Sequence, residues 1–224
     1  MTATVLVGAS GLIGQAVASS LTSETFNPVW VLASNSIEPA LPHHLIRSVN
    51  FAKLETQTEG IDLTGGTLIC TLDTRLRQAV STEAMVRVNR DRVVRVAHWA
   101  RDRGAKHCLV VSSRGANGDS RNLYLRSKGQ AEQELLALSF QRLTLLRPSW
   151  LVGESPEAGL AEKLVVRLAR SASPLLACPL MRRYRPMDVA HLARLLVHQA
   201  ASNSGPMIDI WEAQRINRWR PDSD

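Results

Sequence analysis

Residues 4–14 read Thr-Val-Leu-Val-Gly-Ala-Ser-Gly-Leu-Ile-Gly, and this stretch decides the fold. A short apolar run, typical of a buried strand, ends in glycines, and a segment of helical apolar spacing begins at once. Such a strand–turn–helix is a ready site for a dinucleotide pyrophosphate, because backbone N–H groups point outward and the helix dipole favours negative charge. Gly8 permits the turn, Gly11 the close approach of a phosphate, and Gly14 the tight packing of helix on strand. No Gly-Lys-Ser/Thr follows, so the stretch is not a P-loop.

Strand-like and helix-like segments alternate along the rest of the chain. Strands are predicted near residues 3–8, 28–33, 45–50, 67–71, 107–112, 142–147 and 207–211. Helices are predicted near residues 12–23, 80–103, 121–138, 159–171 and 188–201. This alternation is typical of an α/β fold in which right-handed crossovers place helices on both faces of a parallel sheet. We therefore predict a Rossmann-type doubly wound parallel sheet.

One dinucleotide-binding domain is expected over residues 1–224. A chain of 224 residues is long enough to bury one sizeable core. Prolines interrupt residues 172–187, and we expect 152–187 and 203–224 to contribute a small lobe on the substrate side. The polar residues 212–224 are predicted to form a frayed tail.

Composition argues against a nucleic-acid or membrane protein. The net charge is +7, but the basic residues are mostly arginines scattered along predicted helices, and aromatic residues make up only 4%. That is too few aromatics for a base-stacking platform. No apolar run approaches the roughly 20 residues of a membrane span, and no secretory signal is recognisable.

The cysteines predict a reducing compartment. Cys70, Cys108 and Cys178 are odd in number, far apart and set in apolar runs, which is typical of buried free thiols. No pair has the spacing of metal ligands, so no metal is expected. We expect a cytoplasmic protein.

A second motif joins a strand end to a helix. Val-Val-Ser-Ser (110–113) ends a predicted strand, and Tyr124 follows eleven residues later with Lys128 four residues beyond it. In a helix that spacing puts both side chains on one face. A tyrosine hydroxyl, with an ordinary pKa of about 10, becomes a usable acid or base beside a cation, and a serine hydroxyl holds a carbonyl oxygen where charge develops. These groups suit proton transfer during hydride chemistry.

The motifs resemble those of the extended and atypical short-chain dehydrogenase/reductases. Gly-Ala-Ser-Gly-Leu-Ile-Gly (8–14) is similar to the glycine motif of that superfamily. Val-Ser-Ser-Arg-Gly-Ala-Asn (111–117) and Leu-Tyr-Leu-Arg-Ser-Lys-Gly (123–129) resemble the Tat-interactive-protein-like oxidoreductases, an atypical branch. The resemblance covers roughly residues 3–215. It implies a Rossmann fold, NADP(H) binding and reductase or epimerase-like activity.

The resemblance also implies roles for single residues. Ser113, Tyr124 and Lys128 match the catalytic serine, tyrosine and lysine, and Lys128 would also bind the nicotinamide ribose. Thr71 and Leu72 would flank the adenine and its ribose, and the turn 148–151 the nicotinamide. The residues expected at the cofactor are Gly8, Ser10, Gly11, Leu12, Ile13, Gly14, Ser34, Asn35, Thr71, Leu72, Ser112, Tyr124, Lys128, Pro148 and Leu151.

Two residues in the helical segments leave alternatives open. Asn89 matches a position where the superfamily often keeps a polar residue near the lysine, but a plain exposed helix asparagine is the simpler interpretation. Gly129, directly after Lys128, costs helix stability, roughly 1 kcal/mol against alanine. Close packing against a neighbouring segment or against the cofactor would explain it.

The end of the second strand favours NADP over NAD. It reads Ala-Ser-Asn-Ser (33–36), without the Asp or Glu that holds the ribose 2′-hydroxyl in NAD-specific sites. Contacts to a 2′-phosphate would come from the serines and Asn35, or from Arg75 in a later loop. NAD is the alternative, since the arginines carried here by human-type members of the branch are missing.

The function expected from these residues is an NAD(P)(H)-dependent oxidoreductase acting on a small carbonyl, alcohol or sugar-nucleotide-like substrate. The alternative is a regulatory or sensor protein that binds NADP(H), turns over little and acts through a protein partner. The serine–tyrosine–lysine set favours the enzyme, and the small C-terminal lobe favours the sensor. The sequence leaves monomer and homodimer open.

Overall fold

The computed structural model describes residues 2–74, 79–149, 151–152, 187–202 and 204–221. The strands are β1 (Thr2–Val7), β2 (Phe26–Ala33), β3 (His44–Ser48), β4 (Thr67–Cys70), β5 (His107–Val111), β6 (Arg142–Arg147), β7 (Leu151–Val152), β8 (Met187–Asp188) and β9 (Ile208–Glu212). The helices are α1 (Leu12–Ala18), α2 (Leu54–Gln57), α3 (Thr82–Val86), α4 (Val93–Asp102), α5 (Leu123–Ala137), α7 (Val189–Ala201) and α8 (Ala213–Arg218). A 3₁₀ turn, η1 (Phe51–Lys53), precedes α2, and a π-helical stretch, η2 (Arg87–Arg92), joins α3 to α4.

Seven parallel strands form the main sheet in the order β3-β2-β1-β4-β5-β6-β9. The chain runs outward from β1 to β3 in one direction and then from β4 to β9 in the other. The order therefore reverses between β1 and β4, which is where open α/β sheets bind ligands, at the carboxyl ends of the strands. The predicted doubly wound Rossmann-type sheet is confirmed.

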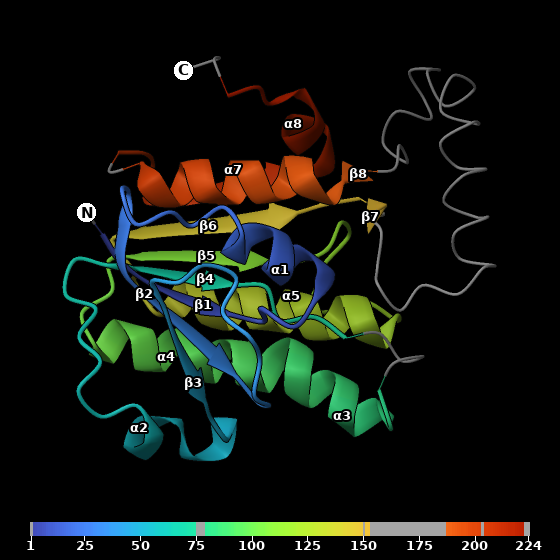
Figure 1. Cartoon of the computed structure of the whole chain (residues 1–224). Helices are drawn as coiled ribbons and strands as arrows, with labels where there is room; N and C mark the ends of the chain where they lie inside the picture. Colours follow the sequence, from blue (N-terminus) through green and yellow to red (C-terminus); the bar gives the residue numbers. More distant parts are fainter. Residues whose placement is uncertain (1, 75–78, 150, 153–186, 203, 222–224) are drawn as a thin grey trace, which may run out of the picture.

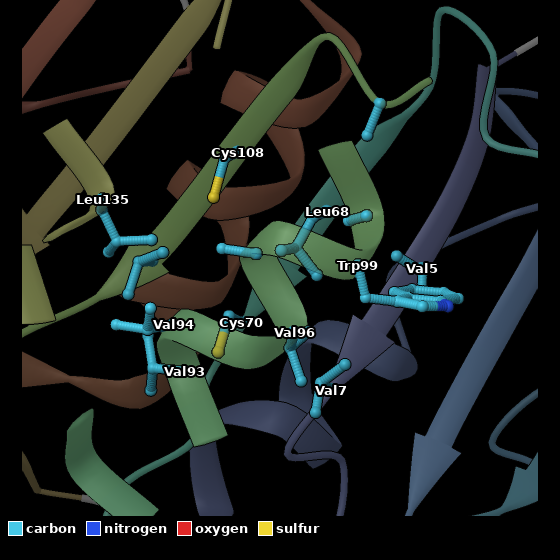
Figure 2. Close-up of a cluster of buried hydrophobic side chains, with 14 of the residues drawn as sticks. Val5, Val7, Leu68, Cys70, Val93, Val94, Val96, Trp99, Cys108 and Leu135 are labelled. Carbon is cyan, nitrogen blue, oxygen red and sulfur yellow. The ribbon is translucent and has the colours of Figure 1, made fainter. Parts of the chain in front are cut away.

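Helices cover both faces of this sheet, with α1, α7 and α8 on one side and α3, α4 and α5 on the other (Figure 1). Strands β4 and β5 are buried along their whole length, as expected where both faces are covered. Figure 2 shows part of the core beneath α4, with the side chains of Cys70 and Cys108 among aliphatic groups. Both are buried free thiols, and burial raises the pKa of Cys70 to about 11. Cys178 lies outside the described residues.

The structure departs from the predicted elements at several places. The first helix ends at Ala18, and the segment 80–103 is three successive helical pieces with the π-helical stretch in the middle. The predicted helix at 159–171 and the irregular segment 172–187 lie outside the described residues except for Met187.

The C-terminal residues differ most from the expected polar tail. The strand predicted near 207–211 is present as β9, which pairs with β6 and forms one edge of the main sheet. Helix α8 then buries Ile216 completely, and Trp219 is 6% exposed. The prediction of fraying is wrong for 213–219, because two apolar residues three apart are enough to anchor one short helix among basic neighbours. No helix in the described ranges is long and apolar enough to cross a bilayer.

Candidate functional site

The glycine turn follows β1 at the point where the strand order reverses. Gly8 has a φ of +95°, which side chains other than glycine rarely adopt. A Cβ on Gly8 would lie 2.6 Å from Thr71 Oγ1 and 2.9 Å from the backbone nitrogen of Leu72. The turn therefore lies directly against the end of β4. Both the positive φ and the lack of space for a Cβ require glycine at position 8.

Gly11 and Gly14 face different surroundings. A Cβ on Gly14 would lie 2.1 Å from the carbonyl oxygen of Gly8, so this glycine lets α1 pack against the turn. Among the described residues, a Cβ on Gly11 would come within 4 Å of that same oxygen alone, at 3.4 Å, and the Gly11 backbone is extended at φ −83°. Packing and backbone conformation thus explain Gly14 but leave Gly11 unexplained. The described residues therefore leave space beside the Gly11 Cα.

The ammonium group of Lys128 is buried between the ends of β4 and β5. Its side chain is 3% exposed. Nζ donates to the carbonyl oxygens of Leu72 at 2.9 Å and Val111 at 3.3 Å, and it lies 3.0 Å from Oδ1 of Asp73. The three donors of the ammonium are matched by three acceptors, which keeps this buried cation paired.

Tyr124 meets the same carboxylate from one helical turn earlier. Its hydroxyl donates to Oδ1 of Asp73 at 3.0 Å. The predicted placement of Tyr124 and Lys128 on one face of a helix thus brings both to one acceptor oxygen. Asp73 itself has a side chain that is 34% exposed, and it is not among the site residues predicted from the sequence.

Asn89 fixes the backbone next to Asp73. Its side chain accepts from the backbone N–H of Thr74 at 2.9 Å and donates to the carbonyl oxygen of Thr74 at 2.7 Å. Asn89 is fully buried, so the interpretation as an exposed helix asparagine is wrong. Asn89 belongs to the π-helical stretch, and its two hydrogen bonds place its side chain against the loop after β4.

The serines follow β5 beside the lysine. Since Val111 accepts from Lys128 through its carbonyl oxygen, the next residues begin at the ammonium. Ser112 is 5% exposed, and its hydroxyl has no hydrogen-bond partner in the described part of the chain. Ser113 is half-buried. The backbone N–H of Arg114 donates to the carbonyl oxygen of Pro148 at 3.1 Å, which brings the turn after β6 to the same place.

Contacts along helix α5 fix its position around Tyr124 and Lys128. Asn122 caps its first turn by accepting from the backbone N–H of Leu125. A Cβ on Gly129 would lie 2.2 Å from the carbonyl carbon of Asn117, so close packing against a neighbouring loop explains this glycine. One turn later Glu132, which is buried, accepts from Arg147 of β6 at 3.0 Å.

The predicted 2′-position lies at the end of β2. Ser34 and Asn35 are exposed there, at the same edge of the sheet as the glycine turn, whereas Arg75 falls outside the described residues. A groove of about 500 Å³ beside them is lined by Ser10, Gln15, Glu38 and residues of β2 and β3. Glu38 lies beyond the four positions that the sequence argument considered, and it brings a carboxylate into the groove.

The predicted residues therefore fall into two groups. One group lies at the ends of β1, β4 and β5 and consists of Gly8, Thr71, Leu72 and Ser112. Lys128 of α5 contacts this group, and Tyr124 is joined to Lys128 through Asp73. Ser34 and Asn35 lie at the end of the neighbouring strand, and Leu151 lies in β7, which pairs with β8. Within the described ranges, no group of three or more His, Cys, Asp or Glu residues is placed to hold a metal.

A Rossmann-type sheet with these motifs at its reversal point defines the class of the short-chain dehydrogenase/reductases. The model of the NAD dependent epimerase/dehydratase family matches residues 4–205, and the chain belongs to that family.

Two relatives indicate to which branch of the short-chain dehydrogenase/reductases the chain belongs. The chain is similar to "Protein FMP52, mitochondrial" of Eremothecium gossypii, with 33% identity over 152 residues that span 66% of each chain. It is similar to "Protein HTATIP2" of Rattus norvegicus, with 29% identity over 230 residues, 98% of this chain and 89% of the relative. Both relatives belong to the atypical branch, so the resemblance found in the sequence is confirmed.

Solved structures share the fold at low sequence identity. The Bordetella bronchiseptica enzyme WbmH, in complex with NAD⁺, has a TM-score of 0.69 and 16% identity over 95% of this chain and 76% of that one. The UDP-Glc/GlcNAc 4-epimerase of Campylobacter jejuni has a TM-score of 0.69 and 10% identity over 96% of this chain and 82% of that one. At these identities the likeness concerns the fold alone.

The expected cytoplasmic location is contradicted by the relatives. The FMP52 proteins of Eremothecium gossypii, Kluyveromyces lactis, Lodderomyces elongisporus and Saccharomyces cerevisiae are all named mitochondrial. The prediction rested on free buried thiols. A reducing environment is not unique to the cytoplasm, and thiols as deeply buried as Cys70 and Cys108 are protected in any compartment, so cysteine usage could not decide the location.

Proposed function

We propose that this chain is an NAD(P)(H)-dependent oxidoreductase, a reductase or epimerase-like enzyme, that acts on a small carbonyl, alcohol or sugar-nucleotide-like substrate. The observation that carries the proposal is the convergence of Tyr124 and Lys128 on one oxygen beside the glycine turn. Membership of the NAD dependent epimerase/dehydratase family supports a nicotinamide cofactor. Two structural features fit such a cofactor: the side of Gly11 that packing leaves open, and the buried Ser112 hydroxyl.

The chemistry divides between cofactor and protein. A bound nicotinamide supplies or accepts the hydride. Tyr124 gives its hydroxyl proton to the substrate oxygen during reduction and takes a proton from the alcohol during oxidation. Lys128 stabilises negative charge on the tyrosine oxygen and holds the ribose, and Ser113 donates a hydrogen bond to the substrate oxygen as charge develops on it.

We assign NADP(H) as the preferred cofactor and NAD as the alternative. Ser34 and Asn35 offer a hydroxyl and an amide to a 2′-phosphate, and the strand end itself bears no carboxylate. Glu38 in the adjacent groove acts in the other direction, because its charge repels a phosphate that comes near. The preference therefore depends on which of these groups meets the 2′-position.

Binding and turnover of the purified full-length chain test the proposal. Calorimetric titration with NADPH and NADH measures cofactor binding, and NADPH oxidation is followed against a panel of aldehydes, ketones, quinones and sugar nucleotides. With a substrate found, Tyr124→Phe lowers kcat by roughly 10²–10⁴, the usual contribution of a positioned acid or base, with little change in cofactor affinity. Full activity in Tyr124→Phe would show that Tyr124 is not the acid or base and that the reaction uses other residues.

Lys128→Met separates the cofactor role from the proton role. It lowers kcat and weakens cofactor binding together, because one ammonium serves both. Lys106→Met is the matched control: Lys106 is exposed and lies just before β5, at the opposite end of that strand from the serines. Equal cofactor affinity in folded Lys128→Met and Lys106→Met would show that Lys128 does not bind the cofactor.

A second candidate function is an NADP(H)-binding sensor with little turnover that acts through a protein partner. The observation in its favour is that Asp73 already accepts hydrogen bonds from both Tyr124 and Lys128. Tight binding of NADPH with no oxidation by any substrate of the panel would favour the sensor. Measurable turnover that depends on Tyr124 would exclude it.

A further inference from the structure

We propose that Asp73 is a positioning residue that holds Tyr124 and Lys128 together before the cofactor binds and competes with the cofactor for their hydrogen bonds. The proposal rests on the proposed function, since it concerns how a nicotinamide dinucleotide enters the same site. It adds a residue that lies in neither sequence motif.

All the proton donors of the pair are engaged in the structure. Tyr124 has one hydroxyl proton, and it is directed to Oδ1 of Asp73 at 3.0 Å. Lys128 has three ammonium protons, matched by the carbonyl oxygens of Leu72 and Val111 and by the same Oδ1 at 3.0 Å. Neither residue has a donor left over. A ribose hydroxyl or a substrate oxygen must therefore replace an existing acceptor.

Asp73 is the acceptor that can leave. The two carbonyl groups on Lys128 belong to the backbone at the ends of β4 and β5, and they move only with the sheet. The Asp73 carboxylate instead lies on a side chain that is one-third exposed, so water takes over its hydrogen bonds when it turns away. A rotation about side-chain bonds is enough to release both donors at once.

The backbone of this loop remains fixed while the side chain turns. Asn89 binds both the N–H and the carbonyl oxygen of Thr74, the residue after Asp73, from a fully buried position. The carboxylate is thus returned to the same place whenever the site is free. In that place it balances the charge of Lys128, which is buried and would otherwise be unpaired.

Competition makes a distinctive prediction about affinity. A residue that only supports the site weakens binding when it is removed, whereas a competitor strengthens binding. We expect Asp73→Ala to bind NADPH and NADH about 10-fold more tightly than the unchanged chain, equivalent to about 1.4 kcal/mol. Asp73→Asn keeps an acceptor oxygen but loses the charge, so we expect a smaller gain, roughly 2- to 5-fold. Both gains shrink at high salt, because part of the competition is charge repulsion.

The experiment is calorimetric titration of the full-length chain and its variants with NADPH and NADH at low and high salt. Asp102→Asn is the matched control, because it removes one negative charge from an exposed residue away from the site. Asp102 ends α4, shortly before β5 begins, whereas the site lies where the strands end. Thermal unfolding of each variant checks that it is folded, and Asp73→Asn serves if Asp73→Ala is not.

Three outcomes decide between the proposals. Tighter binding in the Asp73 variants and unchanged binding in Asp102→Asn supports the inference, even if the unchanged chain binds too weakly to measure. Equal or weaker binding in folded Asp73 variants, with binding by the unchanged chain, overturns the inference and leaves the proposed function standing. Binding of neither dinucleotide by any of the proteins overturns both.

Discussion

Gly11 and Gly14 lie three residues apart in one motif, and we predict that the same substitution at each has opposite consequences. Alanine at Gly14 would place its Cβ 2.1 Å from the Gly8 carbonyl oxygen and 2.7 Å from the Cα of Ala9, where optimal heavy-atom contacts are about 3.5–4.0 Å. Both neighbours are backbone atoms, so α1 must retreat by more than an ångström. Overpacking of this kind costs about 3 kcal/mol, which lowers Tm by about 6–12 °C in a domain of this size.

Alanine at Gly11 meets no such obstacle. The backbone is extended there, and in the part of the chain that the structure describes the new Cβ would have one neighbour, at an ordinary 3.4 Å. We expect the free energy of unfolding to change by less than about 1 kcal/mol, with the entropic gain of Gly→Ala set against a poorer helix cap. The added methyl group nevertheless points to the proposed pyrophosphate. Gly11→Ala should therefore weaken cofactor binding, and Gly11→Glu should abolish it by adding bulk and negative charge.

Two measurements on the same three variants test this reasoning. Denaturant unfolding gives the stability, and calorimetric titration with NADPH gives the affinity. Unchanged affinity in folded Gly11→Glu would refute the pyrophosphate assignment, whatever the stability data say. Unchanged stability in Gly14→Ala would refute the packing argument, since no backbone atom could then be as close as the structure places it.

Three further predictions address stability and cofactor choice. Burial lowers the pKa of His107 to about 3, so below pH 6.5 the unfolded chain takes up a proton that the folded chain refuses. Lowering the pH to 5 therefore lowers the free energy of unfolding by about 2 kcal/mol. His107→Gln, which can keep a bond to Thr144, should remove that loss when denaturant unfolding is compared at pH 5 and 7.5. An equal pH dependence in the variant would contradict this reasoning. Asn89→Leu leaves the N–H and carbonyl of Thr74 without their partner and should cost about 2–4 kcal/mol, whereas an unchanged denaturation midpoint would show that water replaces the amide. Ser34→Asp should shift the preference from NADPH toward NADH, and Glu38→Gln should shift it toward NADPH, as titration with both cofactors measures. A constant ratio of the two affinities would show that the 2′-group does not bind at the end of β2.

The parts of the site that depend on local sequence could be predicted. The roles of Gly8 and Gly14 follow from a strand, a turn and a helix within eleven residues. Gly8 has the positive φ of the expected turn, and Gly14 has the expected close packing of the helix. The common face of Tyr124 and Lys128 follows from helical spacing alone. The alternation of strand-like and helix-like segments predicted the doubly wound sheet, and the resemblance of both motifs to one superfamily implied the same fold.

The parts that depend on long-range contacts could not be predicted. Asp73 has no periodic position and belongs to no motif, and it meets Tyr124 only through a contact between residues 51 positions apart in the sequence. Asn89 was interpreted as an exposed helix asparagine because nothing in its local sequence indicates its partner, the backbone of Thr74, fifteen residues earlier. Ile216 and Trp219 lie among basic residues, and the surface they cover is created by β9 and α7, so composition alone suggested a loose tail.

The position of the site follows from the order of the strands. The chain leaves β1 toward β2 and leaves β4 toward β5, so the segments after these two neighbouring strands diverge. The glycine turn after β1 and residues Thr71–Asp73 after β4 therefore share one space, and a Cβ on Gly8 would touch Thr71. Helix α5, which follows β5, reaches the same space from the other side. Asp73, the third residue after β4, meets the tyrosine and lysine of α5 in this space, and this position is why we expect a residue outside both motifs to affect both.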